Sequence, residues 1–313
     1  MQRGLARLGP DLTLLLLFSS LFLALAVIYG ARWNFFESSI VMPALVAGGI
    51  LAVTFAAHAP RLVRGQADDW AYFRRRVREV ARDWAPFIGL VIVYEHLYMY
   101  TGLIRHDRFD ATMLAWDRAL FGLEPAQWMG RFVHPIATDF FAITYNMYFP
   151  MPLFLVTALA VRGRREDFRE LTTAIVIAMF LGFLGYTLVP VGPPRFFLEG
   201  QFDPPTLHGA FGWFELTQDA QDSINRTKVA ASFPSMHAGL SLLSVVYAWR
   251  FGHAIGRRRL LVAGFGFLAV ALWIATVYLR HHWVVDLFAG FAVALIACIS
   301  APWLRRVWPQ VKI

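Results

Sequence analysis

The sequence predicts an all-α fold, a polytopic membrane bundle of about eight transmembrane helices. Composition supports this class, because 58% of the 313 residues are hydrophobic and 16% are charged, whereas soluble domains carry about 25% charged residues. The apolar residues also gather in long runs separated by arginine-rich segments. The net charge of +8 therefore does not indicate nucleic-acid binding, since most basic residues lie in short loops between the runs.

Each membrane-spanning helix needs about 20 apolar residues. The runs that approach this length are Leu12–Tyr29, Ile40–Ala57, Pro86–Ile104, Phe140–Val161, Leu171–Pro190, Ser232–Trp249, Leu260–Leu279 and Trp283–Pro302. The first run is expected to be an uncleaved span, because a second run follows it closely. We expect residues 1–60 to form two accessory helices, residues 61–85 a cytoplasmic interfacial segment, and residues 86–313 a six-helix core.

The distribution of basic residues predicts the orientation. If both termini are inside, most arginines fall in inside segments, as the positive-inside rule requires.

Charges and aromatic residues alternate in Gly65–Asp83, which predicts an interfacial amphipathic helix, although a basic topology-setting loop fits equally well. Arginine supplies nearly all the basic residues, which is typical of a GC-rich bacterial genome, so we expect an integral protein of a bacterial inner (plasma) membrane.

Three polar stretches meet the outer face in this orientation. They are VPVGPPR at the end of the fifth run, AASFPSMHAG at the start of the sixth, and RHHWVVD at the start of the eighth. Because they meet the same face, we expect the three stretches to form one site at the extracytoplasmic membrane rim.

The single cysteine, Cys298, lies inside an apolar run and allows no internal disulfide.

The third stretch predicts an activated histidine. His282 and Asp286 are four positions apart and share one face of a helix. A carboxylate bonded to one imidazole nitrogen orients the ring and makes the other nitrogen more nucleophilic. Asp286 could instead only neutralise an interfacial histidine, but carboxylates within membrane spans are costly and usually functional.

The second stretch predicts an anion site with an acid. Ser232 or Ser235 can cap the sixth helix, whose N-terminus favours an anion. His237 follows in the first turns and can donate a proton to a leaving oxygen. An ordinary N-cap with an interfacial histidine is the alternative interpretation.

Basic side chains near these stretches can hold a phosphate. Arg195 and Arg280 could donate paired hydrogen bonds to phosphate oxygens, or they could contact lipid headgroups. Contact with lipid headgroups is the preferred interpretation for Lys228. No carboxylate cluster on this face could hold magnesium in the usual way, so we expect neither a metal nor another cofactor.

The motifs PSMH (Pro234–His237) and HWVVD (His282–Asp286) resemble those of the type 2 phosphatidic acid phosphatase superfamily. SFPSMHAG, TVYLRHHWVVDLFAG and WDRALFGLEP are most similar to its inositolphosphotransferase branch, the inositol phosphorylceramide synthase-like proteins. The resemblance runs from about Pro86 to Trp303. It implies a six-helix catalytic core in which His282 forms a phosphohistidine, Asp286 orients it and His237 protonates the leaving group.

The resemblance also implies that Ser235 and nearby basic residues hold the phosphate. The sequence departs from the superfamily signature at three positions: Leu188 replaces a lysine, Met236 replaces a glycine and Thr276 replaces an arginine. Arg280 is the candidate replacement for that arginine. These departures concern phosphate binding rather than His237, His282 and Asp286.

The leading functional hypothesis is a membrane enzyme that transfers a lipid phosphoester. Its partners would be a lipid phosphate or phospholipid donor and a lipid or sugar alcohol acceptor, or water if it is a phosphatase. No protein partner is required. The alternative is a lipid phosphate phosphatase that acts on phosphatidate or a polyprenyl phosphate. A less favoured hypothesis is a lipid transporter, which should carry polar residues at mid-membrane depth. Glu95 and His96 are the best candidates, either as an acceptor pocket or as a satisfied internal pair.

Overall fold

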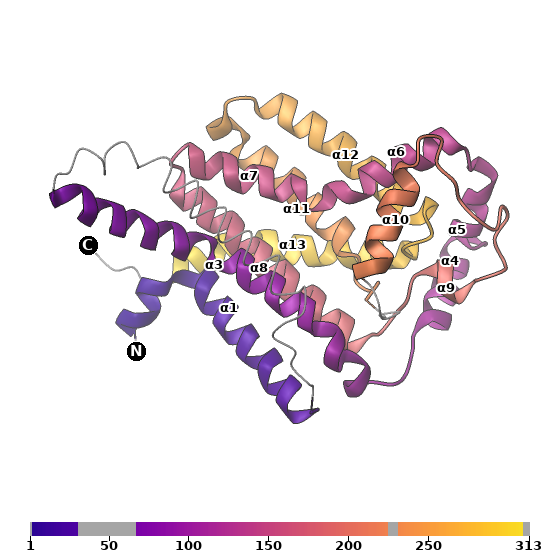
Figure 1. Ribbon diagram of the computed structural model, residues 1–313, viewed down its shortest axis with the longest axis horizontal. Helices are drawn as coiled ribbons and strands as arrows, with labels where there is room; N and C mark the ends of the chain where they lie inside the picture. The colour runs from indigo at the N-terminus through magenta and orange to yellow at the C-terminus, as the bar shows by residue number, and fades with distance from the viewer. Residues whose placement is uncertain (1, 31–66, 225–230, 309–313) are drawn as a thin grey trace. The chain divides into compact units, whose positions relative to one another are not determined.

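The computed structural model describes residues 2–30, 67–224 and 231–308 (Figure 1). The predicted span Ile40–Ala57 and Lys228 lie outside the described residues. The chain divides into two compact units, residues 1–100 with 308–313, and residues 101–307. The described secondary structure is helical, and its one β-bridge pairs Val191 with Ala231.

The first unit contains α1 (Gln2–Ile28) and most of α3 (Ala67–Ile104). Arg82 ties the two helices together, because its guanidinium donates to both carboxylate oxygens of Asp11 at 2.7 and 2.8 Å. The described part of the predicted interfacial segment and the predicted span Pro86–Ile104 form one continuous helix, with Pro86 inside it. His96 is buried, and its Nδ1 lies 2.7 Å from the Ile92 carbonyl oxygen. The Glu95 side chain lies outside the described residues.

The second unit is a helical bundle with short surface helices at one end (Figure 1). The helices of the bundle are α6 (Pro135–Tyr145), α7 (Pro150–Val161), α8 (Arg165–Leu188), α11 (Met236–Ile255), α12 (Arg258–Tyr278) and α13 (Val284–Val307). The remaining elements are α4 (Asp110–Phe121), α5 (Pro125–Trp128), η1 (Met129–Phe132), η2 (Asn146–Tyr148), α9 (Pro194–Phe197) and α10 (Trp213–Ile224).

Four described helices are long and apolar enough to cross a membrane, namely Leu8–Ile28, α8, α12 and α13. The pair Pro135–Tyr148 and Pro150–Val161 makes a fifth if its 45° bend is counted within one span. The predicted span Pro86–Ile104 lies within α3, and residues 236–249 of the predicted span Ser232–Trp249 lie in α11. The protein is an all-α polytopic membrane bundle.

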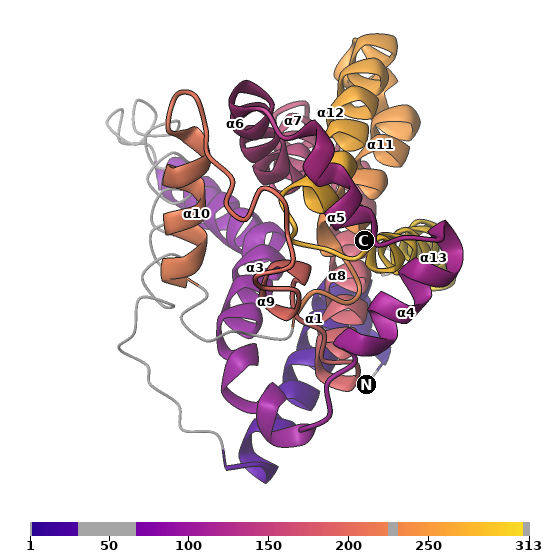
Figure 2. The same cartoon turned by 90° about the vertical axis from the view of Figure 1, so that its right-hand side faces the viewer.

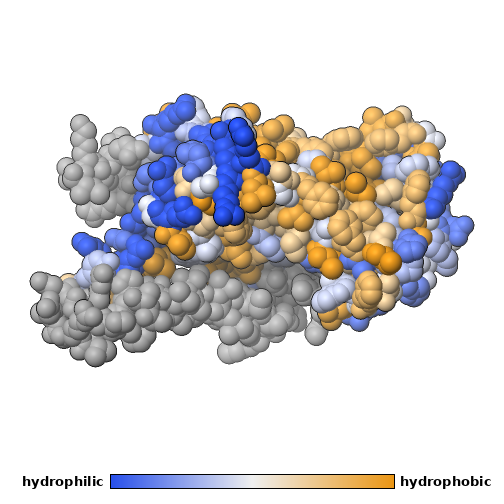
Figure 3. Space-filling view, turned by 90° about the horizontal axis from the view of Figure 1, so that it is seen from above, coloured by the Kyte–Doolittle hydropathy of each residue, from blue (hydrophilic) through white to orange (hydrophobic). Residues whose placement is uncertain are grey.

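The outer faces of the spanning helices are apolar. Exposed large side chains include Phe267 and Ile274 of α12, and Ile299 and Trp303 of α13. Figure 3 shows a broad area of apolar side chains on one face of the molecule, with hydrophilic side chains gathered toward its ends. Lipid chains would cover such a surface without cost.

Helix α11 packs against both α12 and α13, and α8 packs on α13 (Figure 2). A close backbone approach joins α11 to α13. The Ser235 amide donates to the Asp286 carbonyl at 2.9 Å, and a Cβ added at Gly290 would overlap the Ser235 carbonyl oxygen. Only glycine therefore fits at position 290 without moving one helix.

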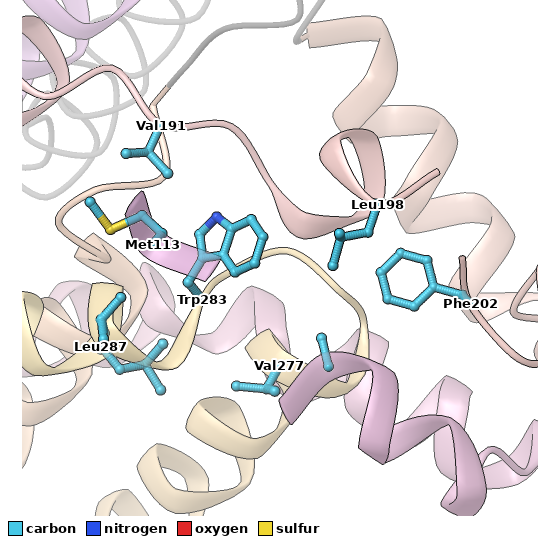
Figure 4. Close-up of a cluster of buried hydrophobic side chains, with 10 residues drawn as sticks. Met113, Val191, Leu198, Phe202, Val277, Trp283 and Leu287 are labelled. Carbon is cyan, nitrogen blue, oxygen red and sulfur yellow. The ribbon is translucent and has the colours of Figure 1, made fainter. Parts of the chain in front are cut away.

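A buried apolar cluster supports the start of α13 (Figure 4). Trp283 is fully buried among Met113, Val191, Leu198 and Val277, and its indole Nε1 donates to the Gly192 carbonyl at 3.0 Å. The cluster joins α4, the 189–202 segment and the ends of α12 and α13. It gives the polar residues described below a rigid base.

We expect Gly290→Ala to lower stability by roughly 1–3 kcal/mol, because the added methyl forces α11 and α13 apart. The thermal unfolding midpoint of the purified protein in detergent measures this change. Gly264→Ala is the matched control, since a Cβ there meets nothing within 4 Å. An unchanged midpoint in Gly290→Ala would show that the close approach is absent.

Candidate active site

His282 and Asp286 are paired as the sequence predicts. His282 lies in the turn before α13, and its Nδ1 is 3.3 Å from Asp286 Oδ2 in the first turn of that helix. The same oxygen accepts the Trp283 amide at 3.1 Å. Both side chains are buried, and Asp286 Oδ1 has no hydrogen-bond partner among the described residues. The carboxylate therefore fixes the imidazole in a site with little solvent.

His237 completes a line of three groups. Its Nδ1 lies 3.2 Å from Nε2 of His282. An ionised Asp286 can only accept, so hydrogen-bond chemistry assigns the proton of His282 to Nδ1 and leaves a lone pair on Nε2. His237 Nδ1 is then the donor to that lone pair. The arrangement places an N–H group of His237 opposite the lone pair of His282 Nε2.

The start of α11 places His237 there. Ser235 caps this helix, as predicted, because its hydroxyl oxygen accepts the Ala238 amide at 3.3 Å. Ser235 is fully buried, and its backbone amide is bonded to Asp286. The adjoining Ser232 amide donates to the Val191 carbonyl at 2.8 Å. The three predicted stretches are therefore joined by backbone hydrogen bonds.

Two tyrosines that the sequence did not single out hold the His237 ring. Tyr145 stacks on it with ring centroids 4.1 Å apart, and Tyr148 lies 4.0 Å away in a tilted geometry. Both tyrosines lie at the bend between α6 and α7, where Pro150 begins the new helix. The bend turns their rings toward α11.

His281 is a further histidine of the site. It is buried, and its ring stacks on Tyr145 with a centroid distance of 4.6 Å. Burial, followed by the nearby charge of Arg195, lowers the pKa of His281 well below its usual value. Both effects favour the neutral form of its imidazole. The only sequence feature that could have pointed to His281 is its position directly before His282.

Arg195 and Arg280 lie together beside these histidines. The Arg195 amide donates to the Arg280 carbonyl at 3.1 Å. The Arg280 guanidinium donates to the Pro204 and Pro205 carbonyls at 2.6 and 2.9 Å and lies over the Phe202 ring. Arg280 also has a φ of 64°, which is rare outside glycine. These contacts tie the 202–205 loop to the turn that carries His282.

Thr276 and Leu188, two of the three residues that depart from the signature, have backbone roles. The Thr276 carbonyl accepts the amides of His281 and His282 at 2.9 and 3.1 Å. The Leu188 carbonyl accepts a hydrogen bond from Arg105 Nη1 at 2.9 Å. The guanidinium of Arg105, from another segment, therefore lies beside the position where the superfamily signature has a lysine. Within the described residues, no group of three or more His, Cys, Asp or Glu side chains could hold a metal ion.

Comparison with known proteins agrees with this geometry. The PAP2 superfamily profile matches residues 111–300, more than half of the chain. Phosphoinositol dihydroceramide synthase of Bacteroides thetaiotaomicron is 25% identical over 235 residues, which cover 70% of this chain and 75% of that protein. The inositol phosphorylceramide synthase catalytic subunit aur1 of Schizosaccharomyces pombe is 36% identical over 90 residues, 28% of this chain and 19% of that protein.

No solved structure matches the chain. The two named relatives agree with the inositolphosphotransferase branch that the motifs resemble. The matched residues 111–300 contain His237, His282 and Asp286. The chain therefore belongs to the PAP2 superfamily and is an enzyme of its phosphotransferase or phosphatase type.

Proposed function

We propose that the protein transfers a phosphorylated headgroup from a phospholipid to a lipid alcohol through a phosphohistidine on His282. The single observation that carries this proposal is the line Asp286, His282, His237, with separations of 3.3 and 3.2 Å. Such a line supplies an orienter, a nucleophile and an acid in the order that covalent phosphoryl transfer needs.

The first step would break the ester bond of the donor. His282 Nε2 attacks phosphorus, and the bond from phosphorus to the diacylglycerol oxygen breaks as the N–P bond forms. His237 gives its proton to the departing alkoxide. Since His237 Nδ1 occupies the lone pair of Nε2 in the free protein, the phosphoryl group must enter between the two rings. Asp286 stabilises the positive charge that develops on His282.

The second step would reverse these roles. The acceptor hydroxyl loses its proton to His237 as its oxygen attacks phosphorus, and the N–P bond to His282 breaks. An alcohol acceptor gives a new phosphodiester, whereas water releases the headgroup as a phosphomonoester; only a phosphomonoester donor attacked by water would make the enzyme a phosphatase. Two observations favour the alcohol: His282 is only 4% exposed, and both named relatives are synthases of inositol-containing sphingolipids. Phosphatidylinositol is accordingly the proposed donor and a dihydroceramide the proposed acceptor.

The phosphate-binding residues are proposed to be Arg195, Ser235 and Arg280, with the start of α11 directed at the anion. The charge of Arg195 acts on the neighbouring His281, which supports its role. Arg280 would bind the phosphate while its guanidinium also donates hydrogen bonds to the 202–205 loop. The positive-inside distribution supports a site on the extracytoplasmic face.

Purified protein given phosphatidylinositol and dihydroceramide should form a phosphoinositol ceramide, detected by mass spectrometry. His282→Ala should reduce its formation by about 10⁴-fold or more, since the nucleophile is lost. His237→Ala should cost about 10²- to 10⁴-fold, because only the acid is lost. His253→Ala, an exposed histidine at the other end of α11, is the control. Full turnover in His282→Ala would refute the mechanism, and free inositol phosphate as the sole product would show that the enzyme hydrolyses the phosphodiester with water instead of transferring the headgroup to an alcohol.

Removal of divalent metal should leave this turnover unchanged. In the proposed steps, protein groups serve as the nucleophile, as the acid and as the hydrogen-bond donors that hold the phosphate, and no metal ion takes part. The same assay with EDTA checks this. Restoration of a lost activity by Mg²⁺ would contradict a metal-independent reaction.

The orientation can be tested with cysteines on either side of α8. In a Cys298→Ser background, we expect Glu199→Cys to react with a membrane-impermeant maleimide in intact cells. Arg164→Cys should react only after lysis. Both positions are exposed, so accessibility depends on the side of the membrane. The opposite labelling pattern would place the site on the cytoplasmic face.

A further inference from the structure

The surface helix α4 presents two buried carboxylates to the site. Asp110 and Asp117 are seven positions apart, about two helical turns, and so lie on the same face. Their exposed fractions are 2% and 0%, whereas Trp116 and Leu120 of the same helix are exposed. Buried carboxylates are costly unless they are hydrogen-bonded, so the partners of this pair reveal its role.

Asp117 binds the beginning of α13. Its Oδ2 accepts the Val284 amide at 2.9 Å, and its Oδ1 accepts the Val285 amide at 3.0 Å, across 167 and 168 positions of sequence. The first amides of a helix have no partner within that helix. Asp117 therefore caps α13 from another element, and its negative charge meets the positive end of the helix dipole.

Asp110 binds the backbone of the VPVGPPR stretch. Its Oδ1 accepts the Gly192 amide at 2.8 Å, and its Oδ2 accepts Arg108 Nε at 2.7 Å. The Gly192 carbonyl in turn accepts the Trp283 indole at 3.0 Å. Thus α4, the 189–195 segment and the start of α13 form a closed set of hydrogen bonds, and α4 lies beside α13 in Figure 2.

The position of the Asp117 contacts matters for chemistry. Val284 and Val285 lie between His282 and Asp286 in the sequence. Fraying of this first turn would change the separation of the histidine and its carboxylate, which is already 3.3 Å. Burial raises the pKa of Asp117 to about 6, and the two amides oppose that rise. The group is therefore mainly ionised at neutral pH and can accept from both amides together.

We propose that Asp117 is a positioning residue for the phosphoryl transfer, holding the first turn of α13 so that His282 and Asp286 stay aligned. It acts through the backbone of Val284 and Val285 and does not touch the reacting atoms. The effect on turnover depends on the proposed function, whereas the effect on the His282–Asp286 pair does not.

Kinetics give the first test. In Asp117→Ala, kcat for headgroup transfer should fall by about 10²-fold, the cost of a misplacement near 1 Å, while the KM for the donor changes little. Asp117→Asn keeps one acceptor oxygen and should fall between this variant and the wild type. The control is Asp107→Asn, which removes the same charge from an 83% exposed side chain nearby. A kcat in Asp117→Ala equal to that of the control would overturn the proposal.

A spectroscopic test is independent of substrate. In protein labelled with ¹⁵N-histidine, the His282 Nδ1 proton bonded to Asp286 should give a downfield NMR resonance. It should be lost or shifted in Asp117→Asn and retained in Asp107→Asn. Retention in Asp117→Asn would overturn the positioning role. If the wild type shows this pattern but no tested donor reacts, the proposed function fails while the positioning role is supported.

A second variant covers the case in which Asp117→Asn does not fold. Val284→Pro removes one of the two amides at the first position of α13, where proline is well tolerated. It should weaken the same resonance and lower kcat while the unfolding midpoint stays close to that of the wild type. A wild-type resonance and kcat in this variant would count against the proposal.

Discussion

The contact between the backbones of α11 and α13 is the constraint on which the rest of the second unit depends. Ser235 donates its amide to Asp286, and Gly290 leaves room for the Ser235 carbonyl. This single crossing brings a residue that follows the cap of α11 opposite a residue that precedes α13. The two histidines are 45 positions apart in the sequence, and neither helix alone could place them 3.2 Å from each other.

Sequence reasoning found the parts of the site whose signals are local. The spacing of His282 and Asp286 and the serine cap before His237 each occupy a few consecutive residues, and the structure brings them together. The contribution of Asp117 could not be inferred in the same way, because its partners are backbone amides 167 and 168 positions away and backbone amides leave no pattern. Tyr145 and Tyr148 depend on a helix bend that separates them from ordinary apolar packing residues only in three dimensions.

The sequence predicted a boundary between two elements at a place where the structure has one continuous helix, α3. The change from charged to apolar residues near Pro86 predicted two elements, yet the helix is continuous from Ala67 to Ile104. Proline removes one amide donor from a helix but does not by itself end it when neighbouring turns stay hydrogen-bonded. Orientation and phosphate binding remain predictions, because they depend on a membrane and a ligand rather than on the fold.

The left-handed backbone at Arg280 has a consequence for how this protein can vary. Glycine adopts a φ of 64° most easily, but glycine lacks the guanidinium that holds the Pro204 and Pro205 carbonyls. Lysine keeps a charge but loses the planar fork that reaches two acceptors at once. Neither glycine nor lysine meets both requirements, so we expect a change at position 280 to be tolerated only together with a change in the 202–205 loop.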